Sequence, residues 1–175
     1  MFSSKLAFAL FTFIGLGAIQ GSYGQTPTGA VAAVPAPPGL SFLYSLNCTL
    51  GTQIPVGTGP RGTRIVIPIV GGTFQGPKLK GKILNLGADW ALSSTDSSGS
   101  VNVDTRYQLV TDDDGANIFI QTNGPSKKDG KIHLRITFET GSDKYYWLNS
   151  VVAVGILTTG SGWVGIDAWE VLSPA

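Results

Sequence analysis

The chain has 175 residues, with 12 basic and 11 acidic side chains and a single cysteine, Cys48. This balance of charge argues against a nucleic-acid partner, which requires clustered Lys and Arg to displace the counterions of the phosphate backbone. One cysteine excludes an internal disulfide, so packing must stabilise a chain long enough for one single-core domain.

The N-terminus has the three parts of a secretory signal. A short basic start ends at Lys5, an almost wholly apolar run follows from Leu6 to Ile19, and Ser22-Tyr23-Gly24 supplies small residues for cleavage. A membrane anchor is the alternative, but this run is shorter than the roughly 20 apolar residues that span a bilayer, and no basic flank follows. We therefore expect residues 1–24 to be a signal peptide and the protein to be secreted, with no membrane span once the signal is removed.

Residues 25–39 form a different kind of segment. They read QTPTGAVAAVPAPPG, rich in Pro, Ala and Thr and without periodicity, which is typical of a flexible leader. The remaining residues, 40–175, are expected to form the folded domain.

From Leu40 onward, each apolar run either alternates with period two or is β-branched, and turn sequences such as GTGPRG, STDSSGS and TTGSG separate the runs. This pattern predicts strands at 40–50, 63–70, 77–86, 89–94, 101–110, 115–122, 131–139, 147–157 and 162–172. Eight or nine strands with short connections favour a single antiparallel β-barrel, because closure removes unprotected sheet edges.

The first predicted strand indicates the environment of two side chains. Alternation would place Leu40, Phe42, Tyr44, Leu46, Cys48 and Leu50 on one face, so Cys48 is expected to be a buried thiol and not a nucleophile. The opposite face carries Asn47, which begins the N-glycosylation pattern Asn47-Cys48-Thr49. A glycan at Asn47 is therefore sterically feasible, and its occupancy stays open.

Two later strands have one apolar and one polar face. Asp104 and Arg106 share the polar face of the 101–110 strand, and Glu139 ends the polar face of the 131–139 strand. If these faces are solvated, Asp104 and Arg106 form an ordinary surface ion pair; if they line a lumen, they can orient a polar group of a substrate.

Known catalytic templates are absent from the sequence. It contains no Gly-x-Ser-x-Gly elbow, phosphate loop or dinucleotide fingerprint. His133 is the sole histidine, and one His with one buried Cys cannot supply a zinc-type ligand set. We therefore expect no metal and no cofactor.

Three segments together resemble a known family. They are PRGTRIVIPIVGGTFQGPKLKGKILNLGADW at 60–90, DTRYQLVTDDDGANIFI at 104–120 and YYWLN at 145–149. The chain resembles domain-of-unknown-function family 3237, also called uncharacterised protein family 0311 and including secreted fungal members, across nearly all of residues 40–173. This resemblance implies a small barrel of the calycin or allene-oxide-cyclase-like kind.

The resemblance also implies candidate pocket residues in these segments and in a further matching segment, FET at 138–140, which contains Glu139. Asp89, which follows a bend expected at Gly87, Asp104, Arg106 and Glu139 are the candidate catalytic residues, and the candidate ligand-binding residues are Trp90, Tyr107, Tyr145, Trp147 and Asn149. Aromatic walls with a few polar groups suit a small-molecule pocket. Trp163 lies outside this set, so it is the control residue for a substitution of Trp147.

Two classes of function remain. The favoured one is a cofactor-independent cyclase, isomerase or dehydratase of natural-product biosynthesis, in which a carboxyl group moves a proton while the barrel binds a hydrophobic small molecule. The alternative is a non-catalytic carrier of such a molecule, or a secreted surface-interaction protein. Convergence of several ionisable candidates in one cavity would favour the enzyme, and a purely apolar lining would favour the carrier. The sequence leaves oligomerisation open.

Overall fold

The computed structural model describes residues 34–96 and 98–174. The expected signal peptide and most of the expected leader lie outside the described residues, so secretion and processing stay predictions. The compact unit considered below spans Ala36–Ala175. Within the described part of the chain, no helix is long and apolar enough to cross a membrane.

The described residues form ten strands and one 3-10 helix. The elements are β1 (Gly39–Leu50), β2 (Ile54–Gly59), β3 (Gly62–Gln75), β4 (Lys80–Asp89), β5 (Leu92–Ser93), β6 (Val101–Thr111), β7 (Asn117–Pro125), β8 (Ile132–Glu139), η1 (Asp143–Ser150), β9 (Ala153–Gly160) and β10 (Trp163–Leu172).

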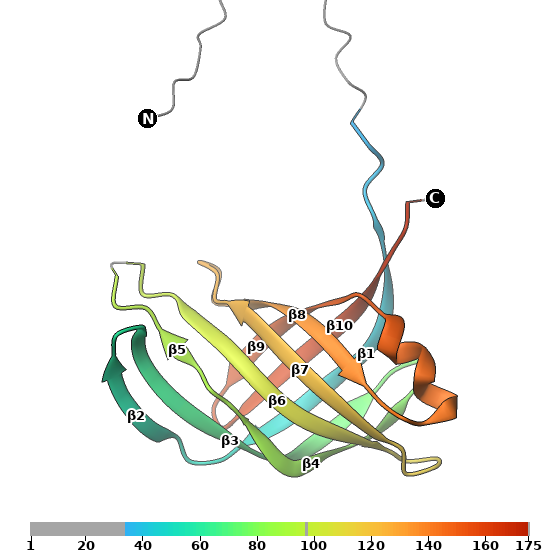
Figure 1. Cartoon of the computed structure of the whole chain (residues 1–175), viewed down its shortest axis with the longest axis horizontal. Helices are drawn as coiled ribbons and strands as arrows, with labels where there is room; N and C mark the ends of the chain where they lie inside the picture. Colours follow the sequence, from blue (N-terminus) through green and yellow to red (C-terminus); the bar gives the residue numbers. More distant parts are fainter. Residues whose placement is uncertain (1–33, 97, 175) are drawn as a thin grey trace, which may run out of the picture. The chain divides into compact units, whose positions relative to one another are not determined.

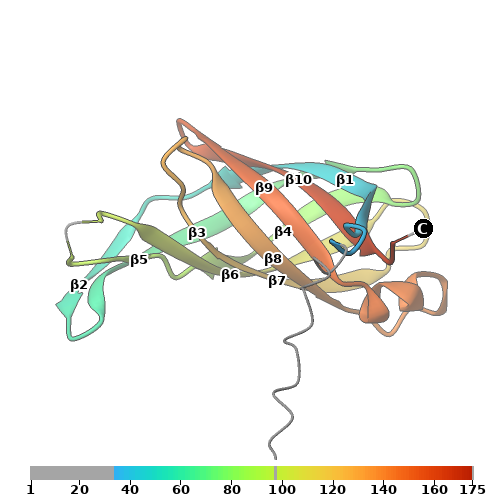
Figure 2. The same cartoon turned by 90° about the horizontal axis from the view of Figure 1, so that it is seen from above.

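The strands close into the expected antiparallel β-barrel. The hydrogen-bonded order is β1-β10-β9-β8-β7-β6-β4-β3, and a direct β1–β3 pairing closes this ring of eight strands. β2 is not part of the ring and pairs only with β3. The short strand β5 pairs with β3 and β6. The β2–β3 hairpin and β5 lie at one end of the barrel, whereas η1 lies at the opposite end (Figures 1 and 2).

Alternating side chains fill the barrel. β8 shows the simplest case, because Ile132, Leu134, Ile136 and Phe138 are buried while the residues between them are exposed. This confirms the predicted faces of the 131–139 strand. Towards the end that carries η1, large side chains fill the interior, and Tyr44 packs edge-on against Phe74 and Phe138 at centroid distances of 6.0 and 6.3 Å.

The YYWLN segment is not part of a strand, contrary to the prediction of a strand over 147–157. It lies in η1, where Tyr145 and Leu148 are buried. These residues are three apart, and a 3-10 helix has three residues per turn, so both point into the barrel end. The strand that follows begins only at Ala153.

Two further differences come from irregular strand geometry. β2 was not predicted: it is a short, fully exposed strand with Pro55, Gly57 and Gly59 in its sequence, and it pairs only with β3. In β1, a register shift between Phe42 and Tyr44 reverses the alternation, so Leu40 and Phe42 are exposed and Leu43 is buried instead. The bulge adds one residue to the strand and thereby changes which face each earlier side chain occupies.

After this bulge, β1 has the expected orientation. Cys48 is buried, as predicted, and the exposed side chain of Asn47 points away from the interior. The Asn47 side chain is therefore on the outer surface, where a glycan could be attached. The modification itself stays a prediction.

Candidate functional site

A cavity of about 410 Å³ occupies the end of the barrel away from η1. Its wall includes the starts of β6 and β8 and the end of β9, whereas η1 connects the opposite ends of β8 and β9. Most of the wall is apolar, with Ile65, Ile67, Ile69, Val103, Ile132, Leu157 and Ile166 among the lining residues. The volume lies in the range of small-molecule sites.

Three polar side chains interrupt this wall in one row. Asp89 on β4 is paired with Thr105 on β6, and Thr105 is paired with Thr122 on β7. All three line the cavity. Side chains at paired positions of adjacent antiparallel strands lie side by side on the same face. Asp89, Thr105 and Thr122 therefore form a polar strip across an otherwise apolar surface.

Glycine at position 87 makes the approach of β4 to β6 feasible. Gly87 has φ of 106°, and a Cβ there would lie 2.1 Å from the carbonyl oxygen of Arg106. The β4–β6 register shifts between Ile83 and Gly87, and beyond this bulge Asp89 turns into the cavity. The bend that the sequence indicates at Gly87 is therefore present, and Asp89 lines the cavity.

The surroundings of Asp89 shift its carboxyl towards the protonated form. Burial raises its pKa above the usual 3.8, and the nearby Asp104 carboxylate acts in the same direction. Hydrogen bonds from the Asp104 N–H and the Thr105 hydroxyl, together with the positive charge of Arg64, oppose this increase. The Asp104 N–H donates to Oδ1 of Asp89 at 2.9 Å, which fixes the orientation of the carboxyl. Such a group can donate and recover a proton.

Tyr107 also lines the cavity, as the resemblance implies. It lies on the inward face of β6, two residues after Thr105, so it forms the next layer along the barrel. Cys48 lines the wall nearby, and burial raises the pKa of its thiol to about 11. The thiol is therefore protonated at neutral pH, in agreement with a packing role.

Asp104 and Arg106 lie on the outer face of β6. Oδ1 of Asp104 is 3.1 Å from Nη1 of Arg106, and their side chains are 43% and 42% exposed. Neither side chain lines the cavity. The solvated alternative for this face is therefore the correct one, because the inward positions of β6 are the odd-numbered ones from Val101 to Leu109.

Glu139 and Trp90 also lie outside the cavity wall. Glu139 is an exposed side chain at the end of β8, on the face opposite to Phe138. The Trp90 ring lies beside the Arg106 guanidinium, whose Cζ is 5.8 Å from the ring centroid. Four candidates expected near a substrate are thus on the outer surface of the barrel: Trp90, Asp104, Arg106 and Glu139.

The three candidates of the YYWLN segment stabilise the opposite end of the barrel. The Tyr145 hydroxyl donates to the Asp113 carboxylate, with O···O distances of 2.8 and 2.9 Å. Asn149 forms two hydrogen bonds of 2.9 Å with the backbone of Thr140. Trp147 packs against the core beneath the Lys78 ammonium, which is 5.1 Å from its ring centroid. These contacts anchor η1, and none of the three residues lines the cavity.

Trp163, the control residue for Trp147, does line the cavity. It follows the β9–β10 turn, and its ring lies beside Gly160, where a Cβ would clash with the indole. Thr105 and Thr122 were also not predicted as site residues. Alternation within strand 101–110 already places Thr105 on the same face as Tyr107. The pairing of Thr105 with Thr122 depends on the strand order, which the sequence pattern does not give.

The fold agrees with comparisons to known proteins. The family model described as protein of unknown function (DUF3237) matches residues 38–133. The chain belongs to this family. The match extends from β1 to the beginning of β8 and therefore includes Asp89, Thr105 and Thr122.

Two relatives are similar to this chain over most of its length. The hydroalkoxylation enzyme phnH of Penicillium herquei is 31% identical over 126 residues, which cover 72% of this chain and 78% of that protein. A UPF0311 protein of Rhodopseudomonas palustris is 26% identical over 148 residues, which cover 75% of this chain and 95% of that protein. The resemblance to both family names is thus confirmed.

A solved structure supports the barrel. A β-barrel-like protein from Acinetobacter baumannii is 39% identical and superimposes with a TM-score of 0.70, covering 79% of this chain and 99% of that one. The single antiparallel barrel predicted from the strand pattern is confirmed.

Proposed function

We propose that this protein is a cofactor-independent enzyme that adds the O–H bond of a hydroxyl group across a carbon–carbon double bond of a mainly apolar natural product, which forms an ether. The observation that carries this proposal is the Asp89 carboxyl in an apolar cavity, where burial raises its pKa. The 31% identity to a protein named as a hydroalkoxylation enzyme supports the same reaction class. Intramolecular addition of this kind is a cyclisation.

The proposed chemistry needs one carboxyl group. Protonated Asp89 transfers its proton to one alkene carbon, which breaks the π bond and leaves a carbocation on the other carbon. The substrate hydroxyl oxygen attacks this carbocation and forms the C–O bond. The hydroxyl proton then returns to the Asp89 carboxylate. One O–H and one π bond are exchanged for one C–H and one C–O bond, so no oxidant or reductant is consumed.

The polar strip has a positioning role in this scheme. Thr105 and Thr122 hydroxyls lie in one row with Asp89, so they can hold the substrate hydroxyl next to the proton donor. The surrounding isoleucine, leucine and valine side chains bind the hydrocarbon portion and limit the water that competes for the carbocation.

The test uses 2-(3-methylbut-2-enyl)phenol, whose protonation gives a tertiary carbocation within reach of its own hydroxyl. Wild-type protein in D₂O should form the cyclic ether 2,2-dimethylchroman with one carbon-bound deuterium. Asp89→Asn should abolish this product, because Asn keeps the size of Asp but cannot donate an acidic proton. Asp104→Asn is the matched control on the outer face. Equal conversion by wild type and Asp89→Asn would remove Asp89 from the reaction.

A carrier function has its own supporting observation. Of the ionisable candidates Asp89, Asp104, Arg106, Glu139 and Tyr145, only Asp89 lines the cavity, and most of the remaining wall is apolar. A carrier would bind the alkenyl phenol and release it unchanged, with similar affinity in wild type and Asp89→Asn. Product formation that depends on Asp89 would exclude simple carriage.

We further propose that the protein is secreted, on the basis of the basic start, apolar run and small-residue cleavage site in residues 1–24.

A further inference from the structure

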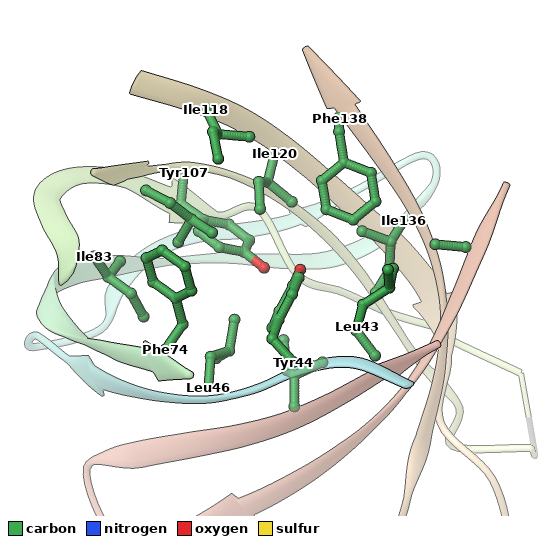
Figure 3. Packing of buried hydrophobic residues seen from close by; sticks show 14 of the residues in the cluster. Leu43, Tyr44, Leu46, Phe74, Ile83, Tyr107, Ile118, Ile120, Ile136 and Phe138 are labelled. Atoms are coloured by element: carbon green, nitrogen blue, oxygen red, sulfur yellow. The ribbon is translucent and has the colours of Figure 1, made fainter. Parts of the chain in front are cut away.

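Two tyrosines face each other inside the barrel. Tyr44 on β1 and Tyr107 on β6 come from strands that are not neighbours in the sheet, and their hydroxyl groups point toward each other (Figure 3). Tyr44 is 0% exposed and Tyr107 is 4% exposed. We call these residues the phenol pair. Tyr107 lines the cavity, whereas Tyr44 lies among the large side chains that fill the other half of the barrel.

The hydroxyls of the phenol pair have no hydrogen-bond partner except each other. Among the described residues, they are the only buried side-chain nitrogen or oxygen atoms in this situation. Two hydroxyls that bond only to each other leave one O–H donor without an acceptor, and a buried donor in this state costs free energy because it has lost its bond to water. The edge-on packing of Tyr44 against Phe74 and Phe138 would be equally served by phenylalanine. Packing therefore does not explain the two oxygen atoms.

Burial also defines the chemical form of the phenol pair. It raises the pKa of both Tyr44 and Tyr107 well above the usual 10. Both side chains are therefore neutral at physiological pH, and each can donate one hydrogen bond.

We propose that the phenol pair is a relay that binds an acceptor oxygen at the inner end of the ligand. In this arrangement Tyr107 donates to a carbonyl or ether oxygen of the ligand, and Tyr44 donates to the Tyr107 oxygen. Both O–H donors then have an acceptor. The ligand class is a neutral, mainly apolar molecule with an acceptor oxygen at the end that enters the cavity first.

The position of the relay makes it a second anchor beside the polar strip. Tyr107 and Thr105 are two residues apart on one face of β6, a separation of about 7 Å along an extended strand. A ligand that contacts both has oxygen atoms at two levels of the barrel. This inference rests on the proposed function only in taking the same cavity as the ligand site.

The test compares two probes of similar shape, 2-acetylnaphthalene and 2-isopropylnaphthalene, which differ in the carbonyl oxygen. Wild-type protein should bind the ketone roughly fivefold to tenfold more tightly than the hydrocarbon, as expected for one hydrogen bond in a dry site. Tyr107→Phe should remove this preference and leave hydrocarbon affinity unchanged. Tyr44→Phe should reduce the preference without removing it. Isothermal titration or intrinsic fluorescence measures each affinity.

The melting temperature of each variant is also measured without ligand. Tyr→Phe removes only the hydroxyl and keeps the ring, so any change in melting temperature reports on the hydroxyl. Each Tyr→Phe change should leave the melting temperature unchanged or raise it. A clear decrease would mean that both O–H donors already have an acceptor in the free protein, and equal binding of the two probes by wild type would also overturn the relay. Failure of both probes to bind would overturn the relay and the proposed site together. A ketone preference that persists in Tyr107→Phe, with intact Asp89-dependent turnover in the wild type, would overturn the relay alone.

Discussion

The backbone N–H of Asp104 donates a hydrogen bond to Oδ1 of Asp89, yet the two carboxyl groups lie on opposite faces of the barrel wall. Asp89 faces the cavity, and Asp104 forms an ion pair with Arg106 on the outside. Antiparallel pairing explains both facts, because Asp89 is paired with Thr105 and the residue before Thr105 must point the other way. One carboxyl is thereby desolvated and the other is solvated.

The first prediction concerns the pH dependence of stability at Asp89. Its folded pKa lies above the unfolded value of 3.8, so its contribution to stability is complete below the unfolded pKa and is lost as pH rises through the folded pKa. Asp89→Asn should therefore raise the melting temperature at neutral pH and have little effect near about pH 3. Calorimetry at the two pH values measures this. A lower melting temperature for Asp89→Asn at neutral pH would contradict the assignment of burial as the dominant influence.

The second prediction is that the pH dependence of turnover reflects the Asp89 carboxyl. If protonated Asp89 is the general acid, turnover of the alkenyl phenol should decrease as pH rises through the Asp89 pKa, which burial raises. The pH–rate profile measures this decrease. A turnover rate that rises over this range would instead indicate a carboxylate acting as the base.

The third prediction concerns Asp104→Asn on the outer face. Loss of an ion pair with side chains 43% and 42% exposed should cost at most about 1 kcal/mol of unfolding free energy. Turnover should remain, since the backbone N–H that orients Asp89 is unchanged. Because the Asp104 charge raises the pKa of Asp89, the variant should also shift the pH–rate profile towards lower pH. Complete loss of turnover with an intact fold would place Asp104 in the mechanism.

The fourth prediction separates two tryptophans. Trp163 lines the cavity and is 39% exposed, so Trp163→Ala should weaken binding of 2-isopropylnaphthalene with a small effect on stability. Trp147 packs against the core at the other end, so Trp147→Ala should cost roughly 2 kcal/mol of unfolding free energy and leave probe affinity unchanged. Urea unfolding and probe titration on both variants test this. The opposite pattern would move the ligand site to the η1 end.

The fifth prediction concerns processing. We expect secreted protein to begin close to Gln25, because Ser22-Tyr23-Gly24 offers the cleavage site. Mass spectrometry of protein recovered from culture medium measures the N-terminus, and treatment with an amidase that removes N-linked glycans reports on Asn47. Recovery of chains that retain Met1 would rule out cleavage.

Much of the barrel could be predicted from local patterns. Period-two alternation identified the strand over 131–139, because each of its side chains faces either the core or solvent. The strand predicted over 147–157 was wrong at its beginning, because Trp147 lies in the 3-10 helix that runs to Ser150 and β9 begins only at Ala153. Leu40 and Phe42 were misplaced because a bulge leaves no mark in an apolar sequence.

For the site, the sequence by itself determined that Asp89 follows a glycine bend and that Tyr107 shares a strand face with Thr105. Only the tertiary structure decided that Asp104 and Arg106 face outward, that Thr122 extends the polar strip and that Tyr44 meets Tyr107. The physical reason is that alternation defines two faces within one strand, whereas neighbours across the wall or the interior depend on strand order, register and closure. These are set by the packing of segments far apart in the chain.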